Sequence, residues 1–500
     1  MNPAINPIVA DIRASLKDAL EDSESEKQAK TRATSALLAN IEAVNLREVC
    51  ESLGWIEDAN GRPPAQKHYK VAIIHHLIET ARLYNWHIIN DSGFFYIYNG
   101  SYWVVLLDIE VKQLLKDAAI KMSYTRIECK DSQFVDKLFL QAVQDGFFAE
   151  RNINKQSIVN LKNGSLVLSE SGIELKTPDH KDFLTHQLDF SYKPDASNCL
   201  FLGYLAEVLP NENTRKTLQE VAGYLFVKGL KMEKIFFLFG TGANGKSVFF
   251  EVLNGVLGEE NISNYSLESL TDTSGYFRAK IKDKIVNYGT DIKLTKIDAG
   301  LFKTLASGEP IEARLPYREP FVMTDYAKLI FNVNKMDSAN IEHTHGFYRR
   351  LLIIPFSQTI ADKDQDKDLH KKILQDRAGV LNWIIDGAER VIKNRNIFIS
   401  EECENFKQRF IKETDSVAMY EEDYMQSNRS NIYYKSVKEA YEDYRSYCTE
   451  AGHSRPLGRN NFVQRMESLG FEKTHKEGGR MLHNNYSRKK VLNDSSEVQF

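Results

Sequence analysis

The glycine-rich stretch "FLFGTGANGKSVFF", residues 237–250, constrains the fold of this chain more than any other feature. It fits the pattern G-x-x-x-x-G-K-[ST] at four positions: Gly240, Gly245, Lys246 and Ser247. The apolar run Ile235–Phe239 before it predicts a buried strand, and the apolar spacing from Lys246 to Leu257 predicts a helix. A strand, a glycine-rich loop and a helix in this order aim backbone N–H groups at phosphate. The sequence therefore predicts an α/β core that binds a nucleotide.

The chemistry of this loop predicts ATP and Mg²⁺ as its ligands. Lys246 is expected to reach the β- and γ-phosphates, and the Ser247 hydroxyl is expected to ligate Mg²⁺. Glycines let the backbone approach phosphate closely because they carry no Cβ. The alternative is a glycine-rich turn that matches by chance, and the flanking strand and helix argue against it. The predicted nucleotide-binding residues are Gly240, Thr241, Gly242, Ala243, Asn244, Gly245, Lys246 and Ser247.

Length and charge indicate several domains and one basic module. A chain of 500 residues is too long for a single core. The net charge of −4 is unevenly spread, because residues 431–490 hold twelve Lys or Arg against seven Asp or Glu. The predicted segments are an N-terminal helical region at 1–84, an α+β domain at 85–232, a nucleotide-binding core at 233–357, a helical extension at 358–425 and a basic module at 431–492.

The cysteines and the apolar runs argue against other classes of protein. The first twenty residues lack the cationic start and apolar core of a signal peptide. No apolar run approaches the length of about 18 residues that spans a membrane. We expect a soluble protein of the reducing cytoplasm with no membrane partner. The five cysteines lie far apart and form no C-x-x-C motif, which disfavours a zinc ribbon or disulfide framework: Cys50, Cys129, Cys199, Cys403 and Cys448.

A carboxylate and an amide at the ends of two predicted strands extend the candidate site. Asp291 ends the strand in "DKIVNYGTDI" and could hold Mg²⁺ and position water, or could cap or solvate a loop. Asn334 follows the strand in "KLIFNVNKMD" and could contact the γ-phosphate. Asn332 competes with it for this role, and a turn-forming asparagine is the alternative.

Two adjacent arginines come directly before an apolar strand in "HGFYRRLLIIPF". A guanidinium group suits the neutralisation of charge on a transferring phosphoryl group. Arg349 and Arg350 would face opposite ways on a strand, so one is expected to act on a neighbouring subunit's nucleotide and the other to form a structural ion pair. A fully solvated pair is the alternative.

The stretch "LFKTLASGEPIEARLPYREPF" predicts a hairpin-like element with basic and aromatic side chains. Such a mixture suits the backbone and bases of a single strand of nucleic acid. Three glutamates dilute its charge, and an ordinary solvated hairpin is the alternative. The predicted DNA-binding residues of this element are Lys303, Arg314, Tyr317 and Arg318.

The basic module reads as two helices and a wing. "YKSVKEAYEDYRSYC" and "GRNNFVQRMESLGF" predict amphipathic helices, and "EKTHKEGGRMLHNNYSRKK" predicts the wing. A winged helix would place its second helix in the major groove and its wing on phosphates. A winged helix that docks protein is the alternative. The candidate DNA contacts are Arg459, Asn460, Arg465, Lys476 and Arg480.

The segment "VVLLDIEV" raises the question of primer synthesis, because Asp108 and Glu110 could belong to a metal-binding set of a primase. No paired histidine motif or third carboxylate accompanies them. The alternative is a strand-to-helix junction in which Asp108 caps a helix that starts near Val111. We favour the junction.

The order of these features resembles superfamily 3 helicases, and closely the helicase part of phage and plasmid primase–helicase proteins and their poxvirus-type relatives. The motifs that carry the resemblance are "GTGANGKS", "FKTLASGEPIEAR", "LIFNVN" and "FYRRLLIIPF". Upstream, "NLKNGSLVLSESG" and "FSYKPDASNCLFLGYLAEVL" look like the domain before the core in that family, and "FFYIYNGSYWVV" looks like its start. The segment "YEDYRSYCTEAGHSRPLGRNNFVQRMESLGF" is similar to the family's winged helix.

The resemblance implies an AAA+-like ring ATPase, mostly a hexamer, that moves 3′ to 5′ on single-stranded DNA. It assigns Asp291 to the acidic Walker B position, Asn334 to the sensor and one of the two arginines to the subunit interface. The hairpin residues would belong to the channel. The family commonly has Glu where this chain has Asp291, and Met336 with Asp337 replaces its usual apolar–Pro pair.

We therefore predict an ATP-driven ring helicase for phage, plasmid or mobile-element DNA replication in a bacterial host. Its expected partners are single-stranded and forked DNA, further copies of itself, and a separate primase or replication initiator. The alternatives are an ATP-switched replication initiator with little unwinding, a primase–helicase that also primes, and a small-molecule kinase. The basic tail and the paired arginines argue against the kinase.

Overall fold

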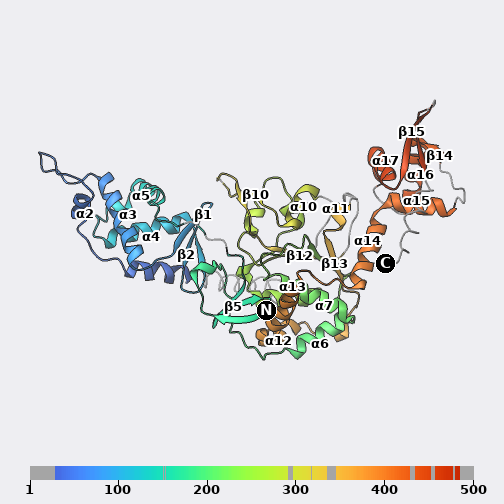
Figure 1. Cartoon of the computed structure of the whole chain (residues 1–500), viewed down its shortest axis with the longest axis horizontal. Helices are drawn as coiled ribbons and strands as arrows, with labels where there is room; N and C mark the ends of the chain where they lie inside the picture. The colour runs from blue at the N-terminus through green and yellow to red at the C-terminus, as the bar shows by residue number, and fades with distance from the viewer. Residues whose placement is uncertain are drawn as a thin grey trace, which may run out of the picture.

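A computed structural model of the chain describes residues 29–149, 151, 154–290, 297–316, 318–334, 345–427, 434–451, 456–476 and 479–484. The molecule is elongated (Figure 1). An N-terminal unit lies at one end, a larger unit built on a parallel sheet lies in the middle, and a small C-terminal unit lies at the other end.

The N-terminal unit packs helices against a three-stranded antiparallel sheet. The sheet has the order β1-β2-β3, and its second turn is fixed by Asn99, whose side chain accepts from the backbone N–H of Ser101 and Tyr102 at 2.9 Å. Asp131 caps α5 by accepting from two backbone N–H groups. The elements are α2 (Leu46–Ser52), α3 (Gln66–Leu83), β1 (Ile88–Asp91), β2 (Phe94–Tyr98), β3 (Trp103–Leu106), α4 (Asp108–Lys121), η1 (Glu128–Lys130) and α5 (Ser132–Gln144).

One hydrophobic cluster holds this unit together, from Ala33 to Phe147. The predicted domain boundary between residues 84 and 85 falls inside it, because α3 and β1 contribute to the same cluster. The helices before residue 84 therefore complete the core of the strands that follow.

A second antiparallel sheet, β4-β5-β6, joins the N-terminal unit to the middle of the chain. Its buried leucines share a cluster with α6, α7 and the parallel sheet, so residues 157–227 pack as part of the central unit. The elements are β4 (Ser157–Leu161), β5 (Gly164–Ser169), β6 (Gly172–Lys176), η2 (His180–Asp182), α6 (Cys199–Val208) and α7 (Glu212–Tyr224).

The central sheet is wholly parallel and has the order β13-β7-β12-β9-β8. Its strands β7, β12 and β13 are almost continuously apolar, as expected where helices cover both faces of a sheet. The elements are β7 (Ile235–Phe239), α8 (Lys246–Leu257), η3 (Glu259–Asn261), β8 (Ile262–Ser263), α9 (Leu267–Leu270), η4 (Arg278–Ile281), β9 (Val286–Gly289), α10 (Ala299–Ser307), β10 (Ile311–Ala313), β11 (Phe321–Met323), β12 (Lys328–Val333), α11 (His345–Tyr348) and β13 (Leu351–Pro355).

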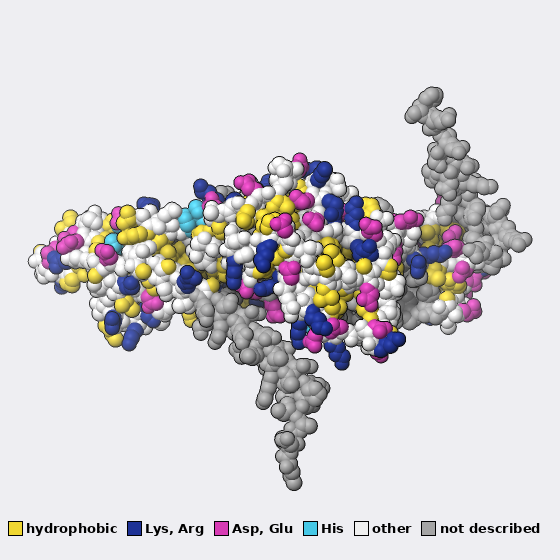
Figure 2. All heavy atoms as spheres, turned by 90° about the horizontal axis from the view of Figure 1, so that it is seen from below, with side chains coloured by type: hydrophobic (Ala, Val, Ile, Leu, Met, Phe, Trp, Pro, Cys, Tyr) yellow, Lys and Arg dark blue, Asp and Glu magenta, His cyan; other side chains and the backbone are white. Residues whose placement is uncertain are grey.

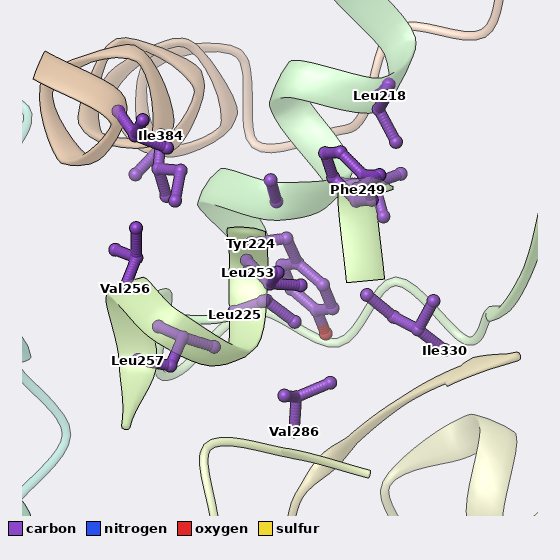
Figure 3. Close-up of a cluster of buried hydrophobic side chains, with 14 of the residues drawn as sticks. Leu218, Tyr224, Leu225, Phe249, Leu253, Val256, Leu257, Val286, Ile330 and Ile384 are labelled. Carbon is purple, nitrogen blue, oxygen red and sulfur yellow. The ribbon is translucent and has the colours of Figure 1, made fainter. Parts of the chain in front are cut away.

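Helix α8 lies between this sheet and two further helices. Figure 3 shows Phe249 and Leu253 of α8 among Val286 and Ile330 of the sheet, with Leu218 of α7 close by. The mixed α/β fold with a parallel sheet is therefore confirmed, and β7 and α8 have the predicted bounds. The hairpin predicted after α10 is present as the antiparallel pair β10–β11.

Helix α13 crosses α7 at very short range. A Cβ on Gly223 would lie 2.1 Å from the backbone nitrogen of Ala388, and one on Gly387 would lie 2.1 Å from the Gln219 carbonyl oxygen. Both glycines are therefore needed for the crossing. The elements here are η6 (Asp362–Asp364), α12 (Leu369–Ile373), η7 (Leu374–Asp376), α13 (Arg377–Asn394) and α14 (Glu401–Thr414).

The C-terminal unit has its own small core around Tyr444 and Phe462. The two predicted helices and the predicted hairpin are present, and β14, which was not predicted, adds a third strand in the order β14-β16-β15. The assignment of this unit as a winged helix stays a prediction. Its elements are α15 (Ser416–Ser427), β14 (Tyr434–Ser436), α16 (Val437–Glu450), α17 (Arg459–Ser468), β15 (Phe471–Lys476) and β16 (Gly479–Asn484).

The surface is mixed in character. Figure 2 shows basic, acidic and hydrophobic side chains interspersed along one face of the molecule. Among the helices that the structure describes, none is long and apolar enough to cross a membrane.

Candidate functional site

The glycine loop, residues 240–247, connects the carboxyl end of β7 to the first turn of α8. The backbone N–H of Gly240 donates to the Val333 carbonyl at 3.0 Å, which ties the loop to the end of the neighbouring strand β12. Gly245 has φ of +83° directly before the helix. A Cβ there would lie 2.6 Å from Val208 Cγ1, so both the conformation and the space require glycine.

Lys246 is buried in the loop, with 4% of its surface exposed. Its Nζ donates to the Gly240 carbonyl at 2.6 Å and to Asn244 Oδ1 at 2.9 Å. A buried ammonium needs such oxygen partners. The loop thus holds the Lys246 ammonium at the amino end of α8. The ammonium and the positive end of the helix dipole both favour the binding of an anion there.

Tyr204 of α6 supports the loop from behind. Its hydroxyl donates to the Gly245 carbonyl at 2.7 Å, and burial raises the pKa of this phenol far above its ordinary value. The neutral hydroxyl is therefore a permanent donor. Sequence reasoning missed Tyr204, because nothing in the apolar stretch around it signals a contact with a loop about 40 residues further on.

A cavity of about 810 Å³ opens above the loop. Gly242 to Ser247 line it from one side, Thr290 and Asn334 line it from the strand ends, and residues 364–370 line it from the segment after β13. That last segment is held against the loop, because the Ile360 N–H donates to the Ala243 carbonyl at 2.7 Å. Thr241 is exposed beside this cavity, and Ser247 is exposed at the first turn of α8.

The loop and the cavity fit a nucleoside triphosphate. The close backbone approach, the cation and the helix amino end meet at one place, as phosphate recognition requires. The cavity volume lies within the usual range of about 300–1,000 Å³ for small-molecule sites. No group of three or more potential metal ligands occurs among the described residues.

The strand-end residues divide as follows. Asn334 follows β12, is exposed and lines the cavity. Asn332 also lines the cavity, but it is 7% exposed and accepts from the Tyr288 hydroxyl at 3.0 Å, so its side chain helps fix β12 to β9. Asp291 lies outside the described residues, although β9 ends at Gly289 and Thr290 reaches the cavity.

The two arginines come directly before β13, as predicted, and lie in the turn between α11 and β13, where the Arg350 N–H donates to the Phe347 carbonyl. Their environments differ. Arg350 is largely buried and donates to Ser307 Oγ at 3.0 Å and to the Gly346 carbonyl at 2.6 Å. Arg349 is half exposed and forms an ion pair with Glu233 at 2.9 Å.

The predicted hairpin residues do not share one surface. Arg318 donates to the Gly93 carbonyl at 2.5 Å and forms an ion pair with Asp108 at 2.6 Å. It therefore joins the hairpin to the N-terminal unit, which sequence spacing could not reveal. Arg314 is exposed, with its guanidinium 6.0 Å from the Tyr276 ring. Lys303 lies on α10, and Tyr317 lies outside the described residues.

Asp108 and Glu110, the two acidic residues considered as metal ligands of a primase, lie in the first turn of α4. The helix starts at Asp108 and not near Val111, and Glu110 is the capping side chain, since it accepts from the Leu107 N–H at 2.6 Å. Glu110 also pairs with Lys30 at 3.4 Å. Both residues therefore belong to the junction between strand β3 and helix α4.

In the C-terminal unit, Arg465 is also a structural residue. Its guanidinium pairs with Asp415, which is 1% exposed, and donates to Ser468 Oγ at 2.9 Å. Arg459 and Asn460 are exposed at the first turn of α17. Lys476 and Arg480 lie on β15 and β16, and their side chains are outside the described part of the structure.

Comparison with protein families finds three matching segments. Residues 48–210 match the description "D5 N terminal like", and residues 412–496 match "Poxvirus D5 protein-like". Residues 238–350, which hold the glycine loop and both arginines, match a family of unknown function (DUF5906).

A curated relative is "Putative helicase L207/L206" of Acanthamoeba polyphaga mimivirus, 25% identical over 177 residues. The match covers 34% of this chain and 18% of that protein, so the chain spans under a fifth of its relative's length. An apo structure of the NrS-1 C-terminal region aligns with a TM-score of 0.45 and 11% identity, over 81% of this chain and 98% of that one. A second apo structure of the same region gives a TM-score of 0.41 over 83% of this chain and 98% of that one.

The two D5-type matches lie on either side of the glycine loop, in the segments where the sequence resembled that family. The mimivirus relative carries a helicase name of its own. Together they confirm the predicted resemblance: two segments of this chain are similar to D5-like proteins, and one stretch is similar to a protein that is named as a helicase.

Proposed function

We propose that this chain is a DNA-dependent ATPase that works as a ring-forming replicative helicase on single-stranded DNA, moving 3′ to 5′. The observation that carries the proposal is the glycine loop at the carboxyl edge of the parallel sheet, with Lys246 buried beside the amino end of α8. The D5-like relationship supports the helicase assignment. A phage, plasmid or other mobile element in the cytoplasm of a bacterial host is the proposed setting.

The predicted catalytic residues take proposed parts. Lys246 holds the β- and γ-phosphates of ATP, and Ser247 with Asp291 holds Mg²⁺, which polarises the phosphate oxygens. Asn334 faces the γ-phosphate from the end of β12. Arg349 is the exposed arginine, so it is the one proposed to reach the nucleotide of a neighbouring subunit in a hexamer.

The same chain offers two surfaces for DNA. Arg314 projects from the hairpin toward the proposed channel, and Arg459 begins the exposed helix α17. Forked DNA would engage both, and a separate primase or initiator would supply the primers. Proposed duplex contacts of the C-terminal unit also include Lys476 and Arg480.

The test is ATP hydrolysis with and without single-stranded DNA, with Lys246→Ala as the blank. Removing the loop ammonium should abolish turnover, whereas Lys393→Ala, an exposed lysine in the last turn of α13, should leave it unchanged. Strong stimulation by DNA in the wild type supports a translocating motor. Hydrolysis that DNA does not stimulate would contradict the motor and favour the replication initiator that uses ATP as a switch.

A further inference from the structure

A second cavity, of about 390 Å³, opens at the opposite edge of the central sheet from the glycine loop. It lies at the amino ends of β7 and β12, beside the last turn of α10. It shares no lining residue with the cavity above the glycine loop. Any ligand here is therefore distinct from the nucleotide proposed at the loop.

The charge of this cavity is strongly positive. Asp325 is the one carboxylate among its lining residues, and it is already shared by Lys228 at 3.2 Å and Arg151 at 3.4 Å. Burial opposes ionisation of Asp325, yet these two cations outweigh it and lower its pKa. Five lysines line what we call the lysine cavity: Lys155, Lys228, Lys231, Lys234 and Lys328.

Several of these cations lack a compensating anion. Lys155 and Lys231 are exposed and form no ion pair with any residue that the structure describes. Lys234 donates to the carbonyl of Arg349, which is a neutral group; burial together with Lys407 lowers the pKa of Lys234, and the nearby Glu404 and Glu233 oppose that shift. A cluster of like charges with too few partners is stabilised by an anionic ligand.

Aromatic rings accompany the lysines. Lys328 Nζ lies 4.4 Å from the ring centre of Tyr224 and 3.3 Å from its hydroxyl. The Tyr326 ring is held in place because its hydroxyl donates to the Glu309 carbonyl at 3.0 Å. Tyr224 is 5% exposed and belongs to the core, so Tyr326 is the partly exposed ring of the two. Lysines beside a fixed, partly exposed tyrosine suit a single strand of nucleic acid, whose phosphates need cations and whose sugars and bases need an apolar face.

The lysine cavity also adjoins the hairpin. Strand β11 ends at Met323, and the next two residues, Thr324 and Asp325, line the cavity. The exposed Arg314 follows the other end of the hairpin, directly after β10. Single-stranded DNA that contacts Arg314 would therefore find the lysine cavity at the base of the same hairpin. The two surfaces can belong to one path.

We propose that the lysine cavity is a further binding site for the phosphodiester backbone of single-stranded DNA, separate from the hairpin tip and from the C-terminal unit. The inference rests on the proposed function, because it takes DNA as the polyanion that this chain meets. It adds a site of at least two phosphates, contacted by Lys155 and Lys231 at the rim and by Lys228 and Lys328 inside.

The experiment measures binding of a fluorescent oligodeoxythymidylate by anisotropy, without nucleotide, over a series of salt concentrations. The variant is Lys155→Ala with Lys231→Ala, since neither side chain supports the fold. The matched control is Lys130→Ala with Lys393→Ala, two exposed lysines far from the cavity. The lost phosphate contacts should weaken binding about tenfold at low salt and flatten the slope of log K against log salt by about 1.4.

The outcomes separate this inference from the proposed function. If the wild type binds DNA and the variant binds it with the same affinity and the same salt dependence, the inference about the lysine cavity is wrong. The proposed helicase function is not affected by that result. A wild type that hydrolyses ATP but binds no DNA would overturn both. A variant that keeps DNA binding but loses DNA-free hydrolysis would show that the cavity receives a nucleotide phosphate from a neighbouring subunit, which also contradicts the inference.

Discussion

Two neighbouring arginines in this protein lie in different environments, because Arg350 is largely buried and Arg349 is half exposed. Arg350 donates to Ser307 and to the Gly346 carbonyl inside the fold and lies 4.0 Å from Glu233, whereas Arg349 pairs with Glu233 at the surface at 2.9 Å. The sequence predicted the pair and the division of roles, but it could not assign them. The assignment depends on the turn after α11, which places one side chain against α10.

The substitutions Arg349→Ala and Arg350→Ala should therefore differ in effect: the first should lower ATP turnover, and the second should lower the free energy of unfolding. Arg350→Ala leaves buried oxygen atoms without donors and should cost about 2 kcal/mol of unfolding free energy, measured by chemical denaturation. Arg349→Ala removes a surface ion pair and should cost under about 1 kcal/mol, while lowering ATP turnover about 10³-fold. Mixing Arg349→Ala chains with Lys246→Ala chains should restore turnover, since an intact loop then meets an intact arginine. No recovery in the mixture would refute action across subunits.

Between elements, the crossing of α7 and α13 brings two helix backbones close together. Local signals predicted β7 and α8 with their bounds, because the apolar periodicity and the glycine loop lie within some 25 residues. The crossing joins segments more than 160 residues apart, and Gly223 and Gly387 have no pattern that announces it. For the same reason, the contact of Arg318 with Asp108 was not predictable.

Gly223→Ala should therefore be severely destabilising. The added Cβ would meet the Ala388 backbone nitrogen at 2.1 Å, and a packed backbone cannot move aside cheaply. We expect a loss of about 3 kcal/mol in unfolding free energy, measured by urea titration. Gly203→Ala is the matched control, because nothing lies within 4 Å of that helical position, and it should be stabilising by about 0.5–1 kcal/mol. Equal effects of the two substitutions would contradict the close crossing.

Across the whole molecule, a buried ionic cluster joins the N-terminal unit to the central one. Asp91 at the end of β1 accepts from Lys282 at 3.0 Å and from Arg151 at 3.0 Å, and Lys282 also contacts Tyr96 and Asp283. Burial raises the pKa of Asp91, but Lys282 and Arg151 outweigh it, so the pKa lies below the ordinary value of 3.8. The ionised form is therefore the one that holds the units together.

Because the pKa of Asp91 is lowered in the folded protein, its contribution to stability is complete at a pH above the ordinary pKa of 3.8. The contribution is lost as the pH falls through the lowered pKa of the folded protein. The wild type should lose unfolding free energy as the pH falls from about 5 to about 3, and Asp91→Asn should lose less over that range. At pH 7 the variant should be about 2–3 kcal/mol less stable, since two buried cations lose an anionic partner. Asp136→Asn, which breaks the exposed pair with Lys112, should change stability by under about 1 kcal/mol. A variant as acid-sensitive as the wild type would contradict this role.

The strand order of the central sheet has a consequence for how the protein is made. Strand β7 leaves the ribosome before both of its neighbours in the sheet, because β12 and β13 follow about 90 and 115 residues later. At roughly 5–20 residues per second, β7 waits several seconds with both hydrogen-bonding edges open. The N-terminal unit has its core complete by Phe147 and can fold during synthesis. Nascent chains of this protein should therefore depend on chaperones in one interval, between the emergence of the apolar run "IFFLF" and that of "LLIIP".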